Sequence, residues 1–142
     1  MSFSEVTSAL IGRLVLAWFF LSQALTAAHH WHASVLMLAM NRVPSPQLML
    51  ALSVLIMIVG SLALIAGFNA RVGALVLFVY MVVISVVMHP YWKISDAAVR
   101  SADYDIFARN IAIAGGLLIL VGTGPGPFAV DNTGGGGGGK RK

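Results

Sequence analysis

Two short clusters of histidine and aromatic residues are the part of this chain best suited to chemistry: His29-His30-Trp31-His32 and His89-Pro90-Tyr91-Trp92. An imidazole group can relay a proton, hydrogen-bond an oxygen atom or bind a metal ion. His29 and His32 are three residues apart, a spacing that lets two side chains on one helix face hold a metal. No carboxylate or thiolate accompanies them at fixed spacing. We therefore assign no metal site and keep these two histidines only as candidate ligands.

An aromatic belt is the competing interpretation of the same clusters. Trp and Tyr are enriched at membrane–water boundaries, where the ring is apolar and its edge is polar. Trp31, Tyr91 and Trp92 each follow a long apolar run. No apolar run contains a carboxylate and the chain has no cysteine, so we expect neither a hydrolytic site nor a cysteine nucleophile.

The composition places these clusters in a membrane protein. The chain has 142 residues, of which 58% are hydrophobic and 10% charged, whereas about 25% are charged in soluble domains. Its mean hydropathy is +0.88. The net charge of +4 depends largely on the last three residues, Lys140, Arg141 and Lys142. A short basic tail is typical of contact with a lipid surface, so we expect a lipid bilayer and no nucleic acid as partner.

Four apolar runs predict an all-α, integral membrane bundle of four transmembrane helices, at about 10–28, 48–67, 71–88 and 106–121. A short interfacial helix is expected over 33–40. Pro90 ends the third span, and the charged segment from Tyr91 to Asp105 is then interpreted as a loop. We take 1–131 as one membrane domain and the glycine-rich, basic segment 132–142 as a flexible tail.

The predicted topology brings both clusters to one membrane face. The first and third helices run in the same direction, so the residues that follow them emerge on the same side, together with the acidic segment after Trp92. Both termini lie on the opposite side, with Arg13, Arg71 and the basic tail. Cations near helix ends favour the cytoplasmic side, and on this basis we expect cytoplasmic termini.

A stripe of small residues marks the last predicted helix. Ala108, Ala112 and Gly116 follow one another at four-residue spacing, which puts them on one face. Small side chains allow another helix to approach closely in a membrane. We expect this stripe to pack against a helix, either of the bundle or of a partner subunit.

Several motifs together resemble those of the DoxX family, which are small four-helix membrane proteins of bacteria and archaea. The resemblance covers about residues 13–131 and rests on these motifs: Arg13-Leu14, Gly60, Gly67, Asn69-Ala70-Arg71, His89-Pro90-Tyr91-Trp92, Arg109-Asn110, Gly115-Gly116-Leu117-Leu118 and Gly124-Pro125-Gly126. Many members carry a glutamate in the second helix, and segment 53–59 of this chain has no carboxylate. The resemblance implies a subunit near quinone chemistry in the cell (inner) membrane of a bacterium or archaeon.

Three functions remain open at this point. The first is a non-catalytic accessory subunit of a larger respiratory or redox complex in the membrane, favoured by the small-residue stripe and by spans without carboxylates. The second is a quinone-interacting oxidoreductase subunit in which His30, His89 and Trp92 line the site for the quinone headgroup. The third is a small transporter or metal-handling protein that uses the histidine face. A self-sufficient enzyme is the less favoured interpretation.

Overall fold

The computed structural model describes residues 3–133, and every element in that range is helical. The elements are α1 (Phe3–His29), α2 (Trp31–Met40), α3 (Pro46–Ala66), α4 (Ala70–Met88), the short 3-10 helix η1 (Tyr91–Lys93), α5 (Ala97–Thr123) and α6 (Val130–Thr133). Helices α1, α3, α4 and α5 are long and apolar enough to cross a membrane. The prediction of an all-α membrane protein with four spanning helices is confirmed. Most of the predicted tail, from residue 134 onward, lies outside the described residues.

The helix boundaries agree with the prediction for α3 and α4 but not for α5. The segment from Tyr91 to Asp105 was expected to be a loop, and this prediction is wrong, because α5 begins at Ala97. The Asp96 side chain accepts a hydrogen bond of 2.9 Å from the amide of Val99 and so caps the start of the helix. The charged residues after Asp96 therefore lie on the first turns of a helix that is longer than the apolar stretch within it.

Helices α3 and α4 form a tight antiparallel hairpin. Gly67 ends α3 in the left-handed conformation, with φ of +67°, which residues with a side chain rarely adopt. Gly60 lets the two helices approach closely, because a Cβ atom at this position would lie 2.6 Å from Cγ of Leu77. The same close approach recurs at Gly73, where a Cβ atom would lie 2.9 Å from Cβ of Ala63.

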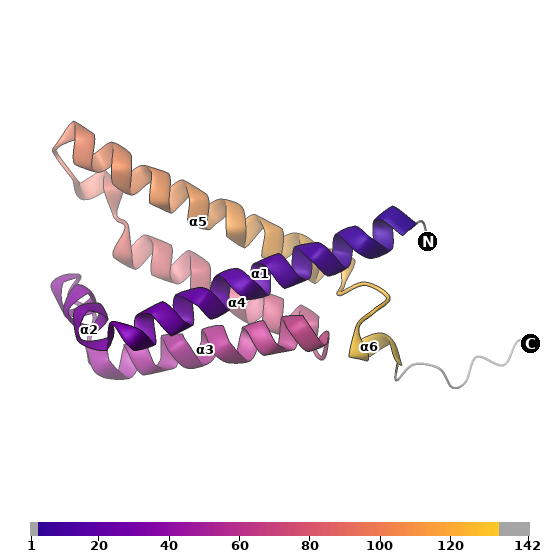
Figure 1. The fold of residues 1–142 in the computed structure, drawn as a ribbon. Coiled ribbons are helices and arrows are strands. Elements are labelled where there is room, and N and C mark those ends of the chain that lie inside the picture. Colours follow the sequence, from indigo (N-terminus) through magenta and orange to yellow (C-terminus); the bar gives the residue numbers. More distant parts are fainter. Residues whose placement is uncertain (1–2, 134–142) are drawn as a thin grey trace, which may run out of the picture.

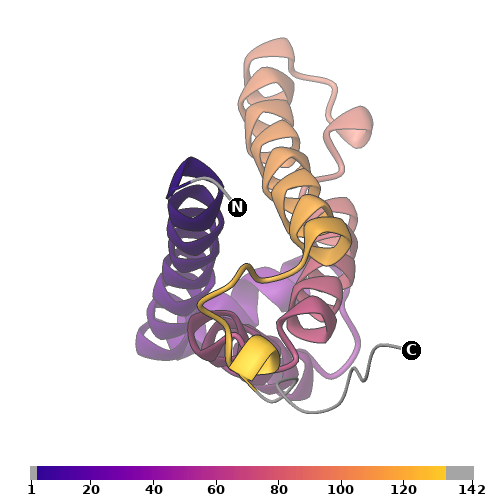
Figure 2. The same ribbon diagram turned by 90° about the vertical axis from the view of Figure 1, so that its right-hand side faces the viewer.

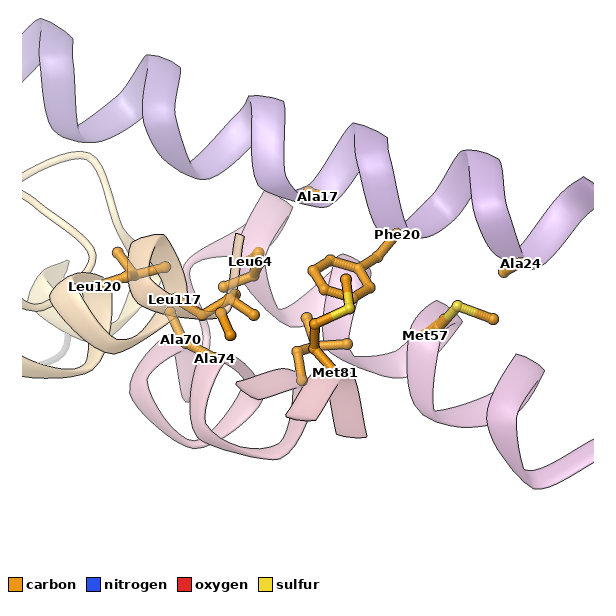
Figure 3. Packing of buried hydrophobic residues seen from close by; sticks show 12 residues of the cluster. Ala17, Phe20, Ala24, Met57, Leu64, Ala70, Ala74, Met81, Leu117 and Leu120 are labelled. Atoms are coloured by element: carbon orange, nitrogen blue, oxygen red, sulfur yellow. The ribbon is translucent and has the colours of Figure 1, made fainter. Parts of the chain in front are cut away.

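The four long helices form an open row rather than a closed bundle. Helix α1 packs on α3, α3 on α4 and α4 on α5, while α1 and α5 share few contacts. Figure 2 shows α1 and α5 diverging from the end that carries α6 toward the opposite end. In Figure 3, Phe20 of α1 lies among side chains of the other helices, near Leu64 and Met81. The core thus joins all four helices, but a cleft remains between α1 and α5.

Candidate functional site

Both histidine clusters lie at the same end of the molecule, at different corners. In Figure 1, the end of α1 with α2 and the segment between α4 and α5 are both at the left, whereas the N-terminus and α6 are at the right. His29, His30 and His32 are exposed, and the rings of His29 and His30 meet edge to face at 4.9 Å. Within residues 3–133, no group of three or more His, Cys, Asp or Glu side chains could hold a metal ion.

His89 is paired with a carboxylate across the gap between two helices. Its Nδ1 atom lies 2.8 Å from Oδ1 of Asp103, and both side chains are partly buried. The second oxygen of Asp103, Oδ2, is buried and has no hydrogen-bond partner among the described residues. A carboxylate in this position fixes the orientation of the imidazole ring. The pair also ties the end of α4 to the second turn of α5.

A cluster of aromatic side chains lies next to this pair along the chain. The ring of Tyr91 lies 5.2 Å from Trp92, 5.1 Å from Tyr104 and 5.2 Å from Phe107, measured between ring centroids. Each such pair contributes about 0.5–1.5 kcal/mol beyond the area that it buries. Trp92 is 51% exposed. This cluster holds the chain after α4 against α5 and leaves part of Trp92 free for lipid headgroups or a ligand.

The three residues predicted to line a quinone site are not brought into mutual contact. In both Figure 1 and Figure 2, the junction of α1 and α2, which contains His30, is separate from the segment between α4 and α5, which contains His89 and Trp92. No hydrogen bond, ion pair or ring contact in the described part of the chain joins His30 to either of the other two. The site predicted from the sequence therefore stays a prediction.

A small pocket with polar groups lies between α1 and the other three long helices, with Asn110 as its one lining residue from α5. It has a volume of about 210 Å³ and is lined by Phe19, Phe20, Gln23, Ala27, Met57, Tyr80, Met81, Ile84 and Asn110. The carboxamides of Gln23 and Asn110 make no side-chain hydrogen bond within residues 3–133. The neighbouring hydroxyl groups of Ser22 and Thr26 donate instead to carbonyl oxygens of their own helix. The two amides are thus the polar groups that this pocket offers to a partner.

The small-residue stripe of α5 begins against α1 and continues along the cleft. Gly116 faces α1, since a Cβ atom there would lie 3.8 Å from Leu16. Ala112 and Ala108 lie one and two turns earlier on the same face of α5. Helix α1 lies farther from α5 at the positions of Ala112 and Ala108, so Ala112 is exposed and Ala108 is half-buried. This face is open to another helix.

At the opposite end, a buried arginine holds the segment that follows α5. Arg13 of α1 is 2% exposed. Its Nη1 donates to the carbonyl oxygen of Pro125 at 2.9 Å and its Nη2 to that of Phe128 at 3.4 Å. Its Nε is buried and has no hydrogen-bond partner among the described residues. Sequence reasoning did not single out Arg13 as a site, although a lone cation within an apolar run is a signal of an internal role.

The same segment caps the start of α4. The two carboxylate oxygens of Asp131 accept hydrogen bonds from the amides of Asn69, at 2.8 Å, and Ala70, at 3.1 Å. The amide of Asp131 donates in turn to the carbonyl oxygen of Gly67 at 3.0 Å. Segment 124–133 therefore links α1 to the turn between α3 and α4 (Figure 1).

Comparisons with known proteins place this fold in a family. The model of the SURF4 family matches residues 34–134, which is more than half of the chain. Over 122 residues the chain is 27% identical to the inner membrane protein YphA of Escherichia coli, and the match covers 86% of each protein. No solved structure matches the chain.

Two further relatives match over shorter stretches. The Surfeit locus protein 4 homolog of Schizosaccharomyces pombe is 38% identical over 69 residues, which is 47% of this chain. The uncharacterized protein T02E1.7 of Caenorhabditis elegans is 34% identical over 65 residues, or 46% of this chain. The matches cover only 22% and 23% of those two proteins.

These findings correct the family expected from the sequence motifs. The resemblance to the DoxX family is wrong, because the family model that matches is that of SURF4. The motifs used for it, such as the turn ending at Arg71 and the exit from α4 at His89, describe where membrane helices end and do not distinguish between families of similar topology. The chain is an integral membrane protein that belongs to the SURF4 family.

Proposed function

We propose that this protein is a non-catalytic, accessory subunit of a larger membrane assembly and that it receives a transmembrane helix of its partner in the cleft between α1 and α5. The observation that carries the proposal is the pair of carboxamides, Gln23 and Asn110, which line this cleft without hydrogen-bond partners in the described structure. We place the protein in a bacterial or archaeal inner membrane with cytoplasmic termini. The Escherichia coli relative is an inner membrane protein, which supports a location in the inner membrane.

The energetics of polar groups in a membrane favour an occupied cleft. Gln23 is exposed and Asn110 half-buried within this chain, so in a membrane their amides would meet lipid, where a polar group without a hydrogen bond is costly. Hydrogen bonds between membrane helices recover about 0.6–2 kcal/mol each. A partner helix with a polar side chain at the level of Asn110 would satisfy these groups. Ala112 is two residues from Asn110 and therefore lies on a different side of α5, where it is exposed and its small side chain leaves room for the partner helix at the edge of the cleft.

The chain has no cysteine, which allows a clean cross-linking test. A photoreactive group attached at Ala112→Cys should give one discrete protein adduct in native membranes. Leu118→Cys is the matched control, because Leu118 is 50% exposed on another face of the same helix. Replacing both Gln23 and Asn110 with Leu should abolish the adduct at position 112. Equal adducts at the two positions, or none at position 112, would overturn the proposal.

A quinone-interacting function is the second candidate and rests on the His89–Asp103 pair. The carboxylate orients the imidazole ring at the end of the molecule that carries Trp92. Nε2 of His89 is then the atom that would hydrogen-bond a quinone oxygen. His89→Ala should reduce the amount of quinone that remains bound after gentle purification, whereas Lys93→Ala, on the adjacent η1, should not. Unchanged quinone content in the His89 variant would remove this candidate.

A further inference from the structure

A large pocket lies at the end opposite the histidines, between the first half of α1 and the last half of α5. Its volume is about 560 Å³. It is lined by Ser8, Ala9, Gly12, Arg13, Leu16, Gly116, Ile119, Leu120, Thr123, Gly124, Gly126 and Pro127. Most of these side chains are apolar or small, so the pocket is a groove on the lipid-facing side of the molecule that ends at a cation.

Among the described residues, the cation at the end of this groove makes no hydrogen bond to an anion. The guanidinium of Arg13 is almost fully buried, and its hydrogen bonds go to two neutral carbonyl oxygens. Asp131 attracts it electrostatically, but both carboxylate oxygens of Asp131 already accept hydrogen bonds from the start of α4. A buried charge is costly unless it is paired. An anionic group at the mouth of the groove would lower that cost.

A second cation, Arg71, lies near the same end of the groove. The guanidinium of Arg71 lies against the backbone of Gly124, where a Cβ atom would be only 2.9 Å from its Nη2. Gly124 is itself part of the groove wall. Arg71 is exposed at the turn between α3 and α4, which is where a spanning hairpin reaches the headgroup layer. The groove therefore joins an apolar channel along the membrane to one buried arginine, Arg13, and one exposed arginine, Arg71.

We propose that this groove binds an anionic phospholipid, with one acyl chain lying between α1 and α5 and the phosphate facing Arg13 and Arg71. Basic pockets between transmembrane helices are suited to anionic headgroups, because the charge and the apolar chain are recognised together. The groove has space for the acyl chain, because a Cβ atom at Gly12 would have no neighbour within 4 Å. This proposal does not depend on the accessory-subunit proposal, which concerns the other end of the cleft.

Lipid retention by the purified full chain tests the proposal directly. The protein is reconstituted with a mixture of phosphatidylglycerol and phosphatidylcholine, and the lipid that remains bound is counted by native mass spectrometry. We expect one retained phosphatidylglycerol per chain and no comparable retention of phosphatidylcholine. Inorganic phosphate should not displace the lipid, since the acyl chain contributes to binding. Equal retention of the two lipids, or displacement by phosphate alone, would overturn the proposal.

Two pairs of variants test whether the lipid binds in this groove and not elsewhere on the molecule. Gly12→Leu fills the groove and should abolish retention, whereas Gly115→Leu adds the same side chain where it also meets no neighbour within 4 Å but outside the groove. Arg71→Gln should weaken phosphatidylglycerol binding about tenfold, as expected for one charge-assisted contact, whereas Arg42→Gln at the other end should not. Retention unchanged by Gly12→Leu, or reduced equally by both leucine variants, would contradict the assignment.

Discussion

Replacing Gly60 with Ala should destabilise the protein, although alanine is the better helix former. The added methyl group would lie 2.6 Å from Cγ of Leu77 and 2.8 and 2.9 Å from its two Cδ atoms. Nonbonded carbon atoms pack best at about 3.5–4.0 Å. Leu77 is fully buried in the core, so it cannot swing into solvent or lipid. Helices α3 and α4 must therefore separate by roughly 1 Å.

The cost of that separation exceeds the gain in helix propensity. Overpacking a well-filled core costs about 1–3 kcal/mol, whereas Gly→Ala within a helix gains about 0.5–1 kcal/mol. We expect a net loss of about 1–2 kcal/mol for Gly60→Ala. Gly122→Ala is the matched control: Gly122 lies within α5 and a Cβ atom there would meet no neighbour within 4 Å. This control should be neutral or slightly stabilised.

Reversible unfolding in mixed micelles, followed by circular dichroism, measures both variants under the same conditions. Leu77→Ala alone should cost about 2–5 kcal/mol through the cavity that it leaves. The loss in the double variant should be smaller than the sum of the two single losses, because the methyl group added at position 60 then occupies part of that cavity. A Gly60→Ala protein as stable as the Gly122→Ala protein would refute the reasoning, and so would strictly additive losses in the double variant.

Three further predictions concern the polar contacts and the orientation. Asp131→Ala should lower the free energy of unfolding by about 1 kcal/mol in the same assay, because it removes the cap of α4; no loss would contradict a capping role. Asp103→Ala should cost about 1 kcal/mol through its hydrogen bond to the imidazole, whereas Asp105→Ala on the same helix should be near neutral. With cytoplasmic termini, a membrane-impermeant maleimide should label Ser45→Cys from outside intact cells but not Phe68→Cys, and the reverse pattern would invert the orientation.

Much of the fold could be predicted because apolar length and helix-breaking residues act locally. Pro46 opens α3 as its first residue, Gly67 closes it and Pro90 follows the end of α4 by two residues. The start of α5 was missed because its first turns are charged and hydropathy was used to set the boundary. A capping residue was nevertheless visible in the sequence, since Asp96 stands immediately before the helix formers Ala97 and Ala98.

The contacts around Arg13 and those around Tyr91 could not be predicted in the same way. Arg13 and Pro125 are 112 residues apart in sequence, and Asn69 and Asp131 are 62 apart. Segment 124–129 has no regular period that would fix its path, so no pattern in the sequence pairs these groups. The aromatic cluster is an intermediate case. The sequence placed Tyr91 and Trp92 at the membrane boundary, but their neighbour Phe107 was expected inside the fourth predicted span, 106–121.

The position of the polar and aromatic contacts explains why the row of helices opens at one end only. At the end that carries α6, Arg13 ties α1 to the segment that leaves α5, and the two helices stay close. At the other end, the His89–Asp103 pair and the rings around Tyr91 tie α5 to the end of α4. Helix α1 is held there by α3 and α2 instead. Because the contacts described within residues 3–133 pull α1 and α5 toward different neighbours at this end, a cleft between them follows from the same residues that stabilise the fold.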